Sequence, residues 1–434
     1  MESGLEACLG MSRKWDAREA GREVAKSAIK DLALPPNFFV LFSTIHYEKY
    51  GGFEELLEGV YDILPPDTPL IGGTVTGFAN NYGVYARGVT GLAVCSSDMD
   101  VAVGYGKNTK RSPKRAAKQC ANMIIKKLEN SKYENKFLLN LISAAELPDM
   151  PPFKGKTVIK SGLTTKLLLP LFGFSQYVFQ KGAGRDDEVT EEMIKQLPEY
   201  NMLGGGTLDN RSTIKNYQFY NNKVLRNSIV SLGLKTELMI NVLTTHNMKQ
   251  SDVEFKITKS SKDGRIIHEI NNKPAASEFL NLLNWSKDFL SDENWFSTNF
   301  YFPLGFKLKE DNNILGPRVI GPIIGESLTT TIRTKDKDVK ILTINGRSLL
   351  STIDENLGSF NVKPCFGLIS SCTTRLETIG NQIYTAKDKI QNFFNNSPFI
   401  VFYVGGESTY SPENGLNYVN MSFNSAIFSK GTRY

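Results

Sequence analysis

The sequence predicts a mixed α/β protein, of the α+β type, in which repeated helix-strand-helix-strand-strand units form layered sheets flanked by helices. The first observation is that a short apolar run leading into a glycine pair occurs three times. The second is that an apolar, strand-like run precedes each of these stretches and another follows it. The glycine pairs are Gly72-Gly73, Gly205-Gly206 and Gly405-Gly406.

Each element of the units has its own sequence signal. The preceding apolar strands are predicted at 37–42, 136–142 and 365–370. Helical spacing of apolar or small residues predicts helices at 17–29 and 53–63, and both end before proline pairs, which cannot continue a helix. Ser112-Pro113 opens a helix in the second unit, because serine caps helices and proline suits the first helical position. Gly346 begins the helix that leads into the third unit.

The units predict two modules after a short tail. Residues 1–16 are expected to form the tail. Residues 17–246 form the first module, with two internal repeats and a proline- and glycine-rich insertion at about 144–184, which is either a lid over a site or an ordinary insertion. Residues 247–434 form the second module. Before the third unit this module is expected to contain a hairpin at 253–257 and 266–270, a helix at 274–283, and strands near 300–308 and 339–344.

Composition narrows the class of protein. A chain of 434 residues with 41% apolar residues buries sizeable cores, and a net charge of +6 is too weak for a dedicated nucleic-acid binder. No apolar run approaches the roughly 20 residues of a membrane span, and the amino end lacks the pattern of a signal peptide. Five scattered cysteines do not form a disulfide framework, so a reducing, cytoplasmic location is expected. They are Cys8, Cys95, Cys120, Cys365 and Cys372.

Common catalytic and cofactor motifs are missing from the sequence. It has no Walker phosphate loop, no complete dinucleotide fingerprint and no Gly-x-Ser-x-Gly elbow. The histidines His46, His246 and His268 lack metal-ligand spacing, and no Cys-x-x-Cys pair is present. We therefore predict no cofactor, no metal and no catalytic residue.

Polar residues of the third unit stand where its strands end. Cys372, Arg375, Glu407 and Asn424 follow neighbouring predicted strands, so they should converge at one end of the sheet, where α/β sheets bind ligands. The alternative is a structural ion pair between Arg375 and Glu407, with Cys372 as buried filler. Cys372 as a nucleophile would need a base, and none is close in sequence. The glycine pairs are equally compatible with tight turns and with ligand contact.

These segments resemble the FIST family (F-box and intracellular signal transduction) over nearly all of 17–428. Each match is short, and it is their joint order and spacing that make the resemblance specific. The amino-terminal matches are Phe39 to Phe42, Pro69 to Gly77 and Leu203 to Asp209. The carboxy-terminal matches are Pro274-Ala275-Ala276, Tyr301 to Gly305, Gly346 to Leu349, Cys372 with Arg375, Gly405-Gly406-Glu407 and Asn424-Ser425.

The resemblance implies a non-catalytic sensory module that binds small molecules such as amino acids. Relatives are often fused to histidine kinases or chemotaxis-type output domains. This chain has no room for such a domain, so a separate signalling partner is expected to read its state. Some relatives carry an F-box, for which residues 1–16 are too short, so an adaptor role in ubiquitin ligation is not expected.

We therefore predict a small-ligand sensor whose ligand is an amino acid or small carboxylate. Arg375 would hold a ligand carboxylate, while Glu407 and Asn424 would hold its polar head. The predicted ligand-binding residues are Gly72, Gly73, Thr74, Gly205, Gly206, Asp209, Cys372, Arg375, Gly406, Glu407 and Asn424. Three alternatives stay open: a haem-binding gas sensor, an interaction scaffold that uses the basic helix at 112–130, and a transferase that depends on Cys372.

Overall fold

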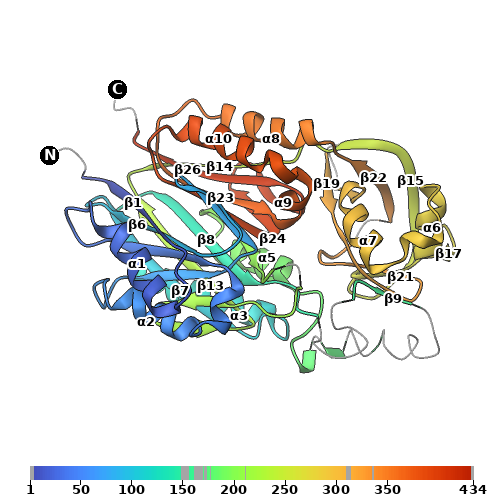
Figure 1. The fold of residues 1–434 in the computed structure, drawn as a ribbon, viewed down its shortest axis with the longest axis horizontal. Helices are drawn as coiled ribbons and strands as arrows, with labels where there is room; N and C mark the ends of the chain where they lie inside the picture. Colours follow the sequence, from blue (N-terminus) through green and yellow to red (C-terminus); the bar gives the residue numbers. More distant parts are fainter. Residues whose placement is uncertain are drawn as a thin grey trace.

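A computed structural model describes residues 4–147, 156–160, 170, 174–175, 177–210, 212–308, 314–334 and 337–431. Within them the chain has the predicted mixed α+β architecture, with three multi-stranded sheets flanked by helices (Figure 1). Much of the expected insertion at 144–184 lies outside the described residues, and so does most of the expected lid. The remaining elements can be compared with the prediction one by one.

Three units share one topology, which confirms the repeat. Each begins with an edge strand and a helix, continues through a central strand and a second helical segment to a parallel strand, and returns through a hairpin to an antiparallel strand. The return strand lies between the edge strand and the central strand, giving the orders β1-β6-β2-β3, β7-β13-β8-β10 and β14-β26-β23-β24. The predicted units lacked the edge strand and the hairpin.

Unit 1 comprises β1 (Glu6–Ser12), α1 (Ala17–Ile29), β2 (Phe38–Ser43), η1 (Ile45–Lys49), α2 (Phe53–Tyr61), β3 (Leu70–Thr74), β4 (Gly77–Asn80), β5 (Gly83–Tyr85) and β6 (Val89–Cys95). Unit 2 comprises β7 (Met99–Lys107), α3 (Pro113–Leu128), β8 (Asn135–Ser143), α5 (Asp186–Gln196), β10 (Asn201–Thr207), β11 (Gln218–Tyr220), β12 (Lys223–Leu225) and β13 (Ser228–Thr236). Unit 3 comprises β14 (Met239–Thr245), α8 (Gly346–Gly358), β23 (Pro364–Cys372), α9 (Thr373–Ile379), η4 (Gly380–Gln382), α10 (Ile383–Phe394), β24 (Phe399–Ser411), β25 (Gly415–Val419) and β26 (Phe423–Ser429).

The expected amino-terminal tail is partly wrong, because it contains strand β1. This strand pairs antiparallel with β6, with Leu9 opposite Leu92. Helix α1 packs closely over it: a Cβ on Gly10 would lie 1.9 Å from the carbonyl oxygen of Val24. The strand is short and only weakly alternating, so its stability comes from its neighbours rather than from local propensity.

The hairpins join the three units into a closed ring. Each hairpin leaves its own unit and pairs with the parallel strand of another: β11 pairs with β3, β4 pairs with β24, and the outer half of β24 pairs with β10. Every strand that carries a glycine pair is therefore flanked on both sides. Unit 1 forms a six-stranded sheet with β11 and β12, while units 2 and 3 share the main eleven-stranded sheet with β4, β5 and β25.

The core lies between these two sheets. Strand β2 is buried on both faces, so alternate residues face different layers: Phe42 points into the space between the sheets, and Leu41 points toward α1 and α2. The rings of Phe42 and Phe402 stack across the sheets with centroids 4.3 Å apart. All three units contribute to this one core.

Two insertions build a third sheet beside the ring (Figure 1). We call residues 249–344 the inserted module. Its β15–β16 hairpin, the helix α6 and the strands β18 and β22 confirm the predicted elements. A piece of the unit 2 insertion, β9 (Val158–Ile159), joins this sheet by pairing with β20. The module comprises β15 (Lys249–Ser260), β16 (Ile266–Ile270), β17 (Lys273–Pro274), α6 (Ala275–Leu282), η2 (Lys287–Phe289), α7 (Asp292–Thr298), η3 (Asn299–Tyr301), β18 (Leu304–Lys307), β19 (Leu315–Arg318), β20 (Ile320–Ile324), β21 (Ser327–Thr330) and β22 (Asp338–Thr343).

Substitution of Gly72 tests whether the glycine pairs are needed for the close packing of neighbouring strands. A Cβ there would lie 1.9 Å from the carbonyl oxygen of Leu41 and 3.1 Å from the Phe219 ring. We expect Gly72→Ala to lower the free energy of unfolding by about 1–3 kcal/mol, because the two strands must move apart. The control is Gly358→Ala, where nothing lies within 4 Å. Urea unfolding followed by circular dichroism measures both, and equal midpoints would contradict the packing role.

Candidate functional site

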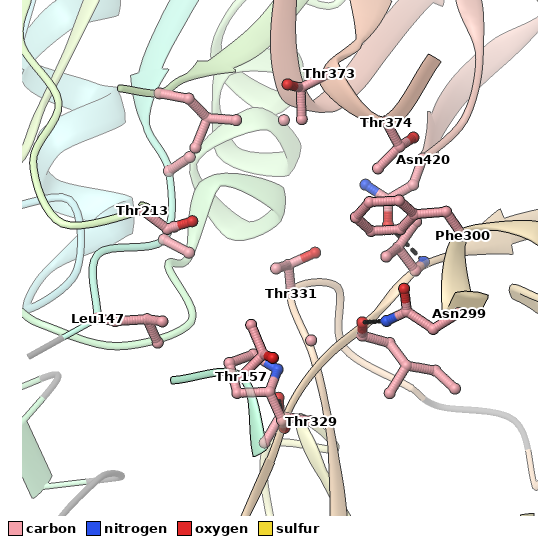
Figure 2. Close-up of a pocket in the computed structure, with 18 of the residues that line it drawn as sticks. Leu147, Thr157, Thr213, Asn299, Phe300, Thr329, Thr331, Thr373, Thr374 and Asn420 are labelled. Atoms are coloured by element: carbon pink, nitrogen blue, oxygen red, sulfur yellow. Dashed lines mark hydrogen bonds between the residues drawn. The ribbon is translucent and has the colours of Figure 1, made fainter. Parts of the chain in front are cut away.

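A cavity of about 800 Å³ lies between the ring of units and the inserted module. One side is formed by loops at the carboxyl ends of strands in units 2 and 3, and the other by α7, η3 and the strands β20 and β21 (Figure 2). Threonines from both sides, including Thr373 of the ring and Thr331 of the module, surround the open space. Trp295, Phe300 and Ile320 supply an apolar surface.

The ring side of the wall depends on a glycine bulge within strand β24. Gly405 and Gly406 leave the inner half of β24, and Gly406 has a φ of +65°, which favours glycine. A Cβ on Gly406 would lie 2.6 Å from the Oδ2 atom of Asp186 and also collide with the hydroxyl of Tyr418. The bulge therefore makes room for a carboxyl group at the cavity wall.

Asp186 is that carboxyl group. It is the first residue of α5, it is 4% exposed, and it lines the cavity. Its Oδ2 atom accepts a short hydrogen bond from the hydroxyl of Tyr418. Burial, together with the adjacent charge of Asp187, raises the pKa of Asp186 to about 7. The cavity thus contains a carboxyl group whose charge is sensitive to what binds beside it.

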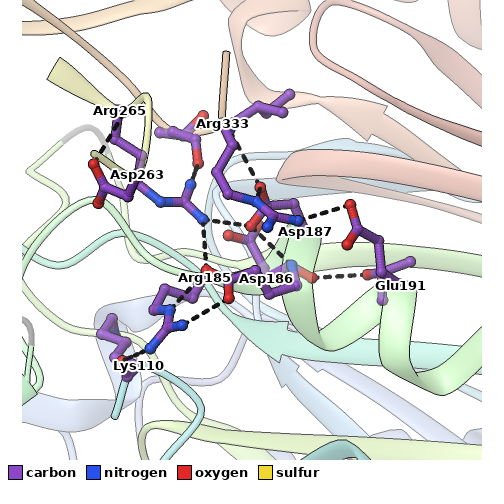
Figure 3. Close-up of polar contacts among 12 residues, drawn as sticks. Lys110, Arg185, Asp186, Asp187, Glu191, Asp263, Arg265 and Arg333 are labelled. Carbon is purple, nitrogen blue, oxygen red and sulfur yellow. Dashed lines mark hydrogen bonds and ion pairs between the residues drawn. The ribbon is translucent and has the colours of Figure 1, made fainter. Parts of the chain in front are cut away.

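Asp187, the next residue, faces the other way and binds the inserted module (Figure 3). Its Oδ1 atom lies 2.6 Å from Arg265 Nη2, and its Oδ2 atom lies 3.1 Å from Arg333 Nε. Burial alone would raise the pKa of Asp187, but the two arginines outweigh it and hold the pKa below its usual value. We call Asp187, Arg265 and Arg333 the arginine latch.

Further acidic groups surround the latch. Glu188 lies 3.3 Å from Arg265 and 2.6 Å from Arg185, and Glu191 lies 2.7 Å from Arg333. Arg265 is 2% exposed, so its charge is neutralised inside the protein. The first turns of α5 therefore connect the cavity wall to the inserted module.

A second buried carboxyl group lies behind the wall, next to Cys372. Glu407 is 0% exposed, and its Oε2 atom accepts a hydrogen bond of 3.2 Å from the hydroxyl of Ser422. Burial raises the pKa of Glu407 to about 8. Burial and the charge of Glu407 also raise the pKa of the Cys372 thiol well above its usual value. This environment stabilises the thiol over the nucleophilic thiolate.

The predicted cluster is close together but mostly covered. Cys372 and Gly406 line the cavity. The Arg375 guanidinium donates to the carbonyl oxygens of Leu349 (2.7 Å) and Met421 (3.4 Å). Asn424 donates to Ser370 O, accepts from Thr244, and does not line the cavity either. Among the ion pairs between described residues, none joins Arg375 to Glu407, so the expected structural ion pair is not observed.

The remaining predicted residues are not among the described lining residues; the glycines and Thr74 lie at contacts between strands or units, and Asp209 bonds within its own loop. Thr74 accepts a hydrogen bond of 3.0 Å from the backbone of Tyr217, and Asp209 accepts from the backbone of Thr213 and Ile214. A Cβ on Gly73 would meet Thr207, and one on Gly205 or Gly206 would meet Val404 or Gly405, respectively. Ligand binding by Gly72, Gly73, Thr74, Gly205, Gly206 and Asp209 stays a prediction.

Sequence reasoning missed the residues that frame the cavity. Asp186, Tyr418 and the inserted module's Trp295 and Thr331 carried no recognised motif. The available signal was the run Asp186-Asp187-Glu188 directly after the predicted insertion, since three adjacent carboxylates at a helix start suggest bound cations or arginines.

A model of the FIST N domain matches residues 37–273, more than half of the chain. The chain belongs to the FIST family. This family consists of signal-transduction sensors. The match ends beyond the predicted module boundary at 246, and the FIST C module stays a prediction.

Similarity to solved structures is weak. Cyanuric acid hydrolase from A. caulinodans aligns with 7% identity and a TM-score of 0.37, covering 99% of this chain and 100% of that one. PurLQS from Thermotoga maritima aligns with 10% identity and a TM-score of 0.19, covering 98% of this chain and 72% of that one. The search of curated proteins gave no match. Neither structural alignment supports an inference about activity.

Two further findings concern the described residues only. Within them, no helix has the length and apolar character needed to cross a membrane. Nor does this part of the FIST chain bring together three or more histidine, cysteine, aspartate or glutamate side chains that could hold a metal ion.

The arginine latch predicts a large effect of Asp187→Asn. The substitution leaves Arg265 buried and Arg333 half-buried without their shared carboxylate, so the free energy of unfolding should fall by about 3–5 kcal/mol. The control is Asp354→Asn, whose exposed pair with Lys389 contributes at most about 1 kcal/mol. Two of the three tryptophans, Trp285 and Trp295, lie in the inserted module, so tryptophan fluorescence in urea measures the loss. Similar midpoints would rule the latch out.

The raised pKa of Glu407 predicts that the stability of the fold depends on pH. Its pKa is raised from 4.5 to about 8 on folding, so the folded protein holds this proton more tightly than the unfolded chain. Stability present at low pH is therefore lost as the pH rises through about 8. Glu407→Gln cannot titrate, so its melting temperature relative to wild type should increase between about pH 5 and about pH 9. Exposed Glu413→Gln is the control. A difference that does not change with pH would be evidence against this assignment.

Proposed function

We propose that this FIST protein is a non-catalytic sensor that binds a small molecule in the cavity between the ring and the inserted module. Amino acids and small carboxylates are the first candidates. The observation that carries the proposal is the position of the cavity: its lining comes from both parts of the chain. A ligand there contacts both parts at once, so its binding free energy depends on how they are arranged.

The size and lining of the cavity support small-molecule binding. Its volume of about 800 Å³ is within the range of ordinary ligand sites. Apolar groups such as Trp295 and Phe300 provide area, and hydroxyl groups such as Thr331 and Thr373 provide a few oriented polar contacts. This combination is typical of sites that select a ligand by shape and hydrogen bonding.

The chemistry of the wall supports binding rather than catalysis. Cys372 is the lining residue with the strongest nucleophilic potential, and its surroundings favour the protonated thiol. Nearby Glu407 is also mostly protonated at neutral pH, because burial raises its pKa to about 8. A protonated carboxylic acid beside a thiol is a poor general base.

The arginine latch offers a route from ligand to output. Asp186 lines the cavity, and Asp187 binds Arg265 and Arg333 of the inserted module. A ligand that moves the start of α5 would therefore change the position of the inserted module relative to the ring. A separate protein that contacts both surfaces would detect that change.

The haem alternative receives no support from the lining. His46, His246 and His268 all lie in the described part of the chain, and none of them is among the residues that line the cavity there. An iron-binding side chain would have to come from another residue type.

Filling the cavity should abolish ligand binding. We expect Thr373→Trp to fold and to lose any mass that co-purifies with the wild type in native mass spectrometry, because the indole occupies the open space. Exposed Thr385→Trp makes the same chemical change on α10 and should keep that mass. A thermal-shift screen against amino acids and small carboxylates extends the test. Wild-type protein that carries nothing and is stabilised by none of these compounds would argue against a ligand sensor.

A further inference from the structure

We propose that the ligand of this cavity carries a protonated amine, which binds the carboxylate of Asp186. The inference rests on the proposed sensor function and names the chemical class that the site selects. It starts from the charges around the cavity, since a desolvated charged group discriminates more strongly than a neutral one.

The charged side chains that line the cavity in the described part of the chain are mostly acidic. They are Asp186, Asp292, Glu293 and Glu377, beside one exposed base, Lys156. Glu293 and Glu377 each interact with another group, so the inference does not rest on their charges. Asp292 is committed to the backbone, since its Oδ1 atom accepts from the N–H groups of Thr157 (2.6 Å) and Val158 (2.8 Å). Asp186 is therefore the lining acid on which the inference rests, and its carboxylate favours a cationic ligand group over an anionic one.

The two arginines of the arginine latch do not neutralise Asp186. Arg265 and Arg333 are both bound by Asp187, and they also pair with Glu188 and Glu191, respectively. Neither arginine is among the described lining residues. Their positive charges are neutralised by the carboxylates of Asp187, Glu188 and Glu191.

Asp186 lacks the ion pairs that neutralise the charge of Asp187. Among the ion pairs between described residues, Asp187 takes part in two and Asp186 in none. The hydroxyl of Tyr418 fixes one oxygen of Asp186, and this oxygen occupies the space that a side chain at position 406 would need. A buried carboxylate without a counter-charge is costly, and a bound ammonium group supplies the charge together with hydrogen bonds.

The apolar wall fits the remainder of such a ligand. Trp295 is 1% exposed and Phe300 is 8% exposed, so both are already packed and present fixed surfaces. The Trp295 indole donates to the carbonyl oxygen of Gly321, which holds the ring in place. A small amine with an apolar or aromatic body therefore matches both parts of the lining.

Three probes with one phenyl ring test the inference. They are 2-phenylethylamine, 2-phenylethanol and 3-phenylpropionate, which are positive, neutral and negative at pH 7.5. Isothermal titration calorimetry on the full chain should give the amine at least about tenfold higher affinity than the alcohol, and the carboxylate the lowest affinity. Equal affinities, or a preference for the carboxylate, would overturn the amine inference and leave the sensor function standing.

A variant assigns the effect to Asp186. Asp186→Asn should lower the affinity for 2-phenylethylamine about tenfold and leave 2-phenylethanol unchanged, whereas exposed Asp354→Asn should change neither. An unaltered amine affinity in Asp186→Asn overturns the assignment. If that variant does not fold, the three probes on the wild type decide the inference alone. Binding of none of the probes at millimolar concentration would overturn the amine inference, while the sensor function is decided separately by native mass spectrometry and the thermal-shift screen.

Discussion

The pairing of each hairpin with another unit is the constraint on which the structure depends. Within its own unit, the parallel strand that carries the glycine pair has a neighbour on one side only. Its other edge would have unpaired N–H and C=O groups, which invite pairing with other chains. Here β3, β10 and β24 each receive a strand from a different unit. Because three such exchanges close a ring, no unit completes its own sheet. The glycine pairs belong to this arrangement, since they allow the close approach of strands and loops where the units meet.

The cavity exists because two of the three units contain insertions. Units 2 and 3 each carry one, at 144–184 and 249–344, and the two combine in a single sheet through β9 and β20. Unit 1 carries none, and its second helix follows its central strand closely. Repetition thus supplies a rigid frame, and the departures from repetition supply the binding surface. The acidic start of α5 lies at this junction, with one carboxylate facing the cavity and the next holding the inserted module.

The sequence contained enough information for the units but not for their assembly. Apolar periodicity and proline positions placed α1, α2, the central strands and the β15–β16 hairpin, because these signals are local. Strand β1 was missed because its stability comes from β6 and α1. The hairpin exchange was also missed, since pairing between units leaves no short-range pattern.

The candidate site was predicted only in part, because local sequence signals do not show which distant residues meet. The predicted strands brought Cys372, Glu407 and Asn424 to one region, although Glu407 lies within β24 and Asn424 within β26 rather than beyond a strand end. Strand order also does not say which side chains reach open space. Arg375 points to carbonyl oxygens rather than to a carboxylate. Asp186 was not recognised because its role depends on Tyr418, more than two hundred residues away.

The closed ring also constrains how the chain folds during synthesis. Asn81, just after β4, is bonded to Ser397, just before β24, across 316 residues of sequence. At ordinary rates of translation the first hairpin waits about 15 to 60 seconds before its partner strand leaves the ribosome. Throughout that interval the nascent chain exposes strand edges that the finished protein covers. The architecture therefore leaves these edges open to wrong pairing until the chain is almost complete.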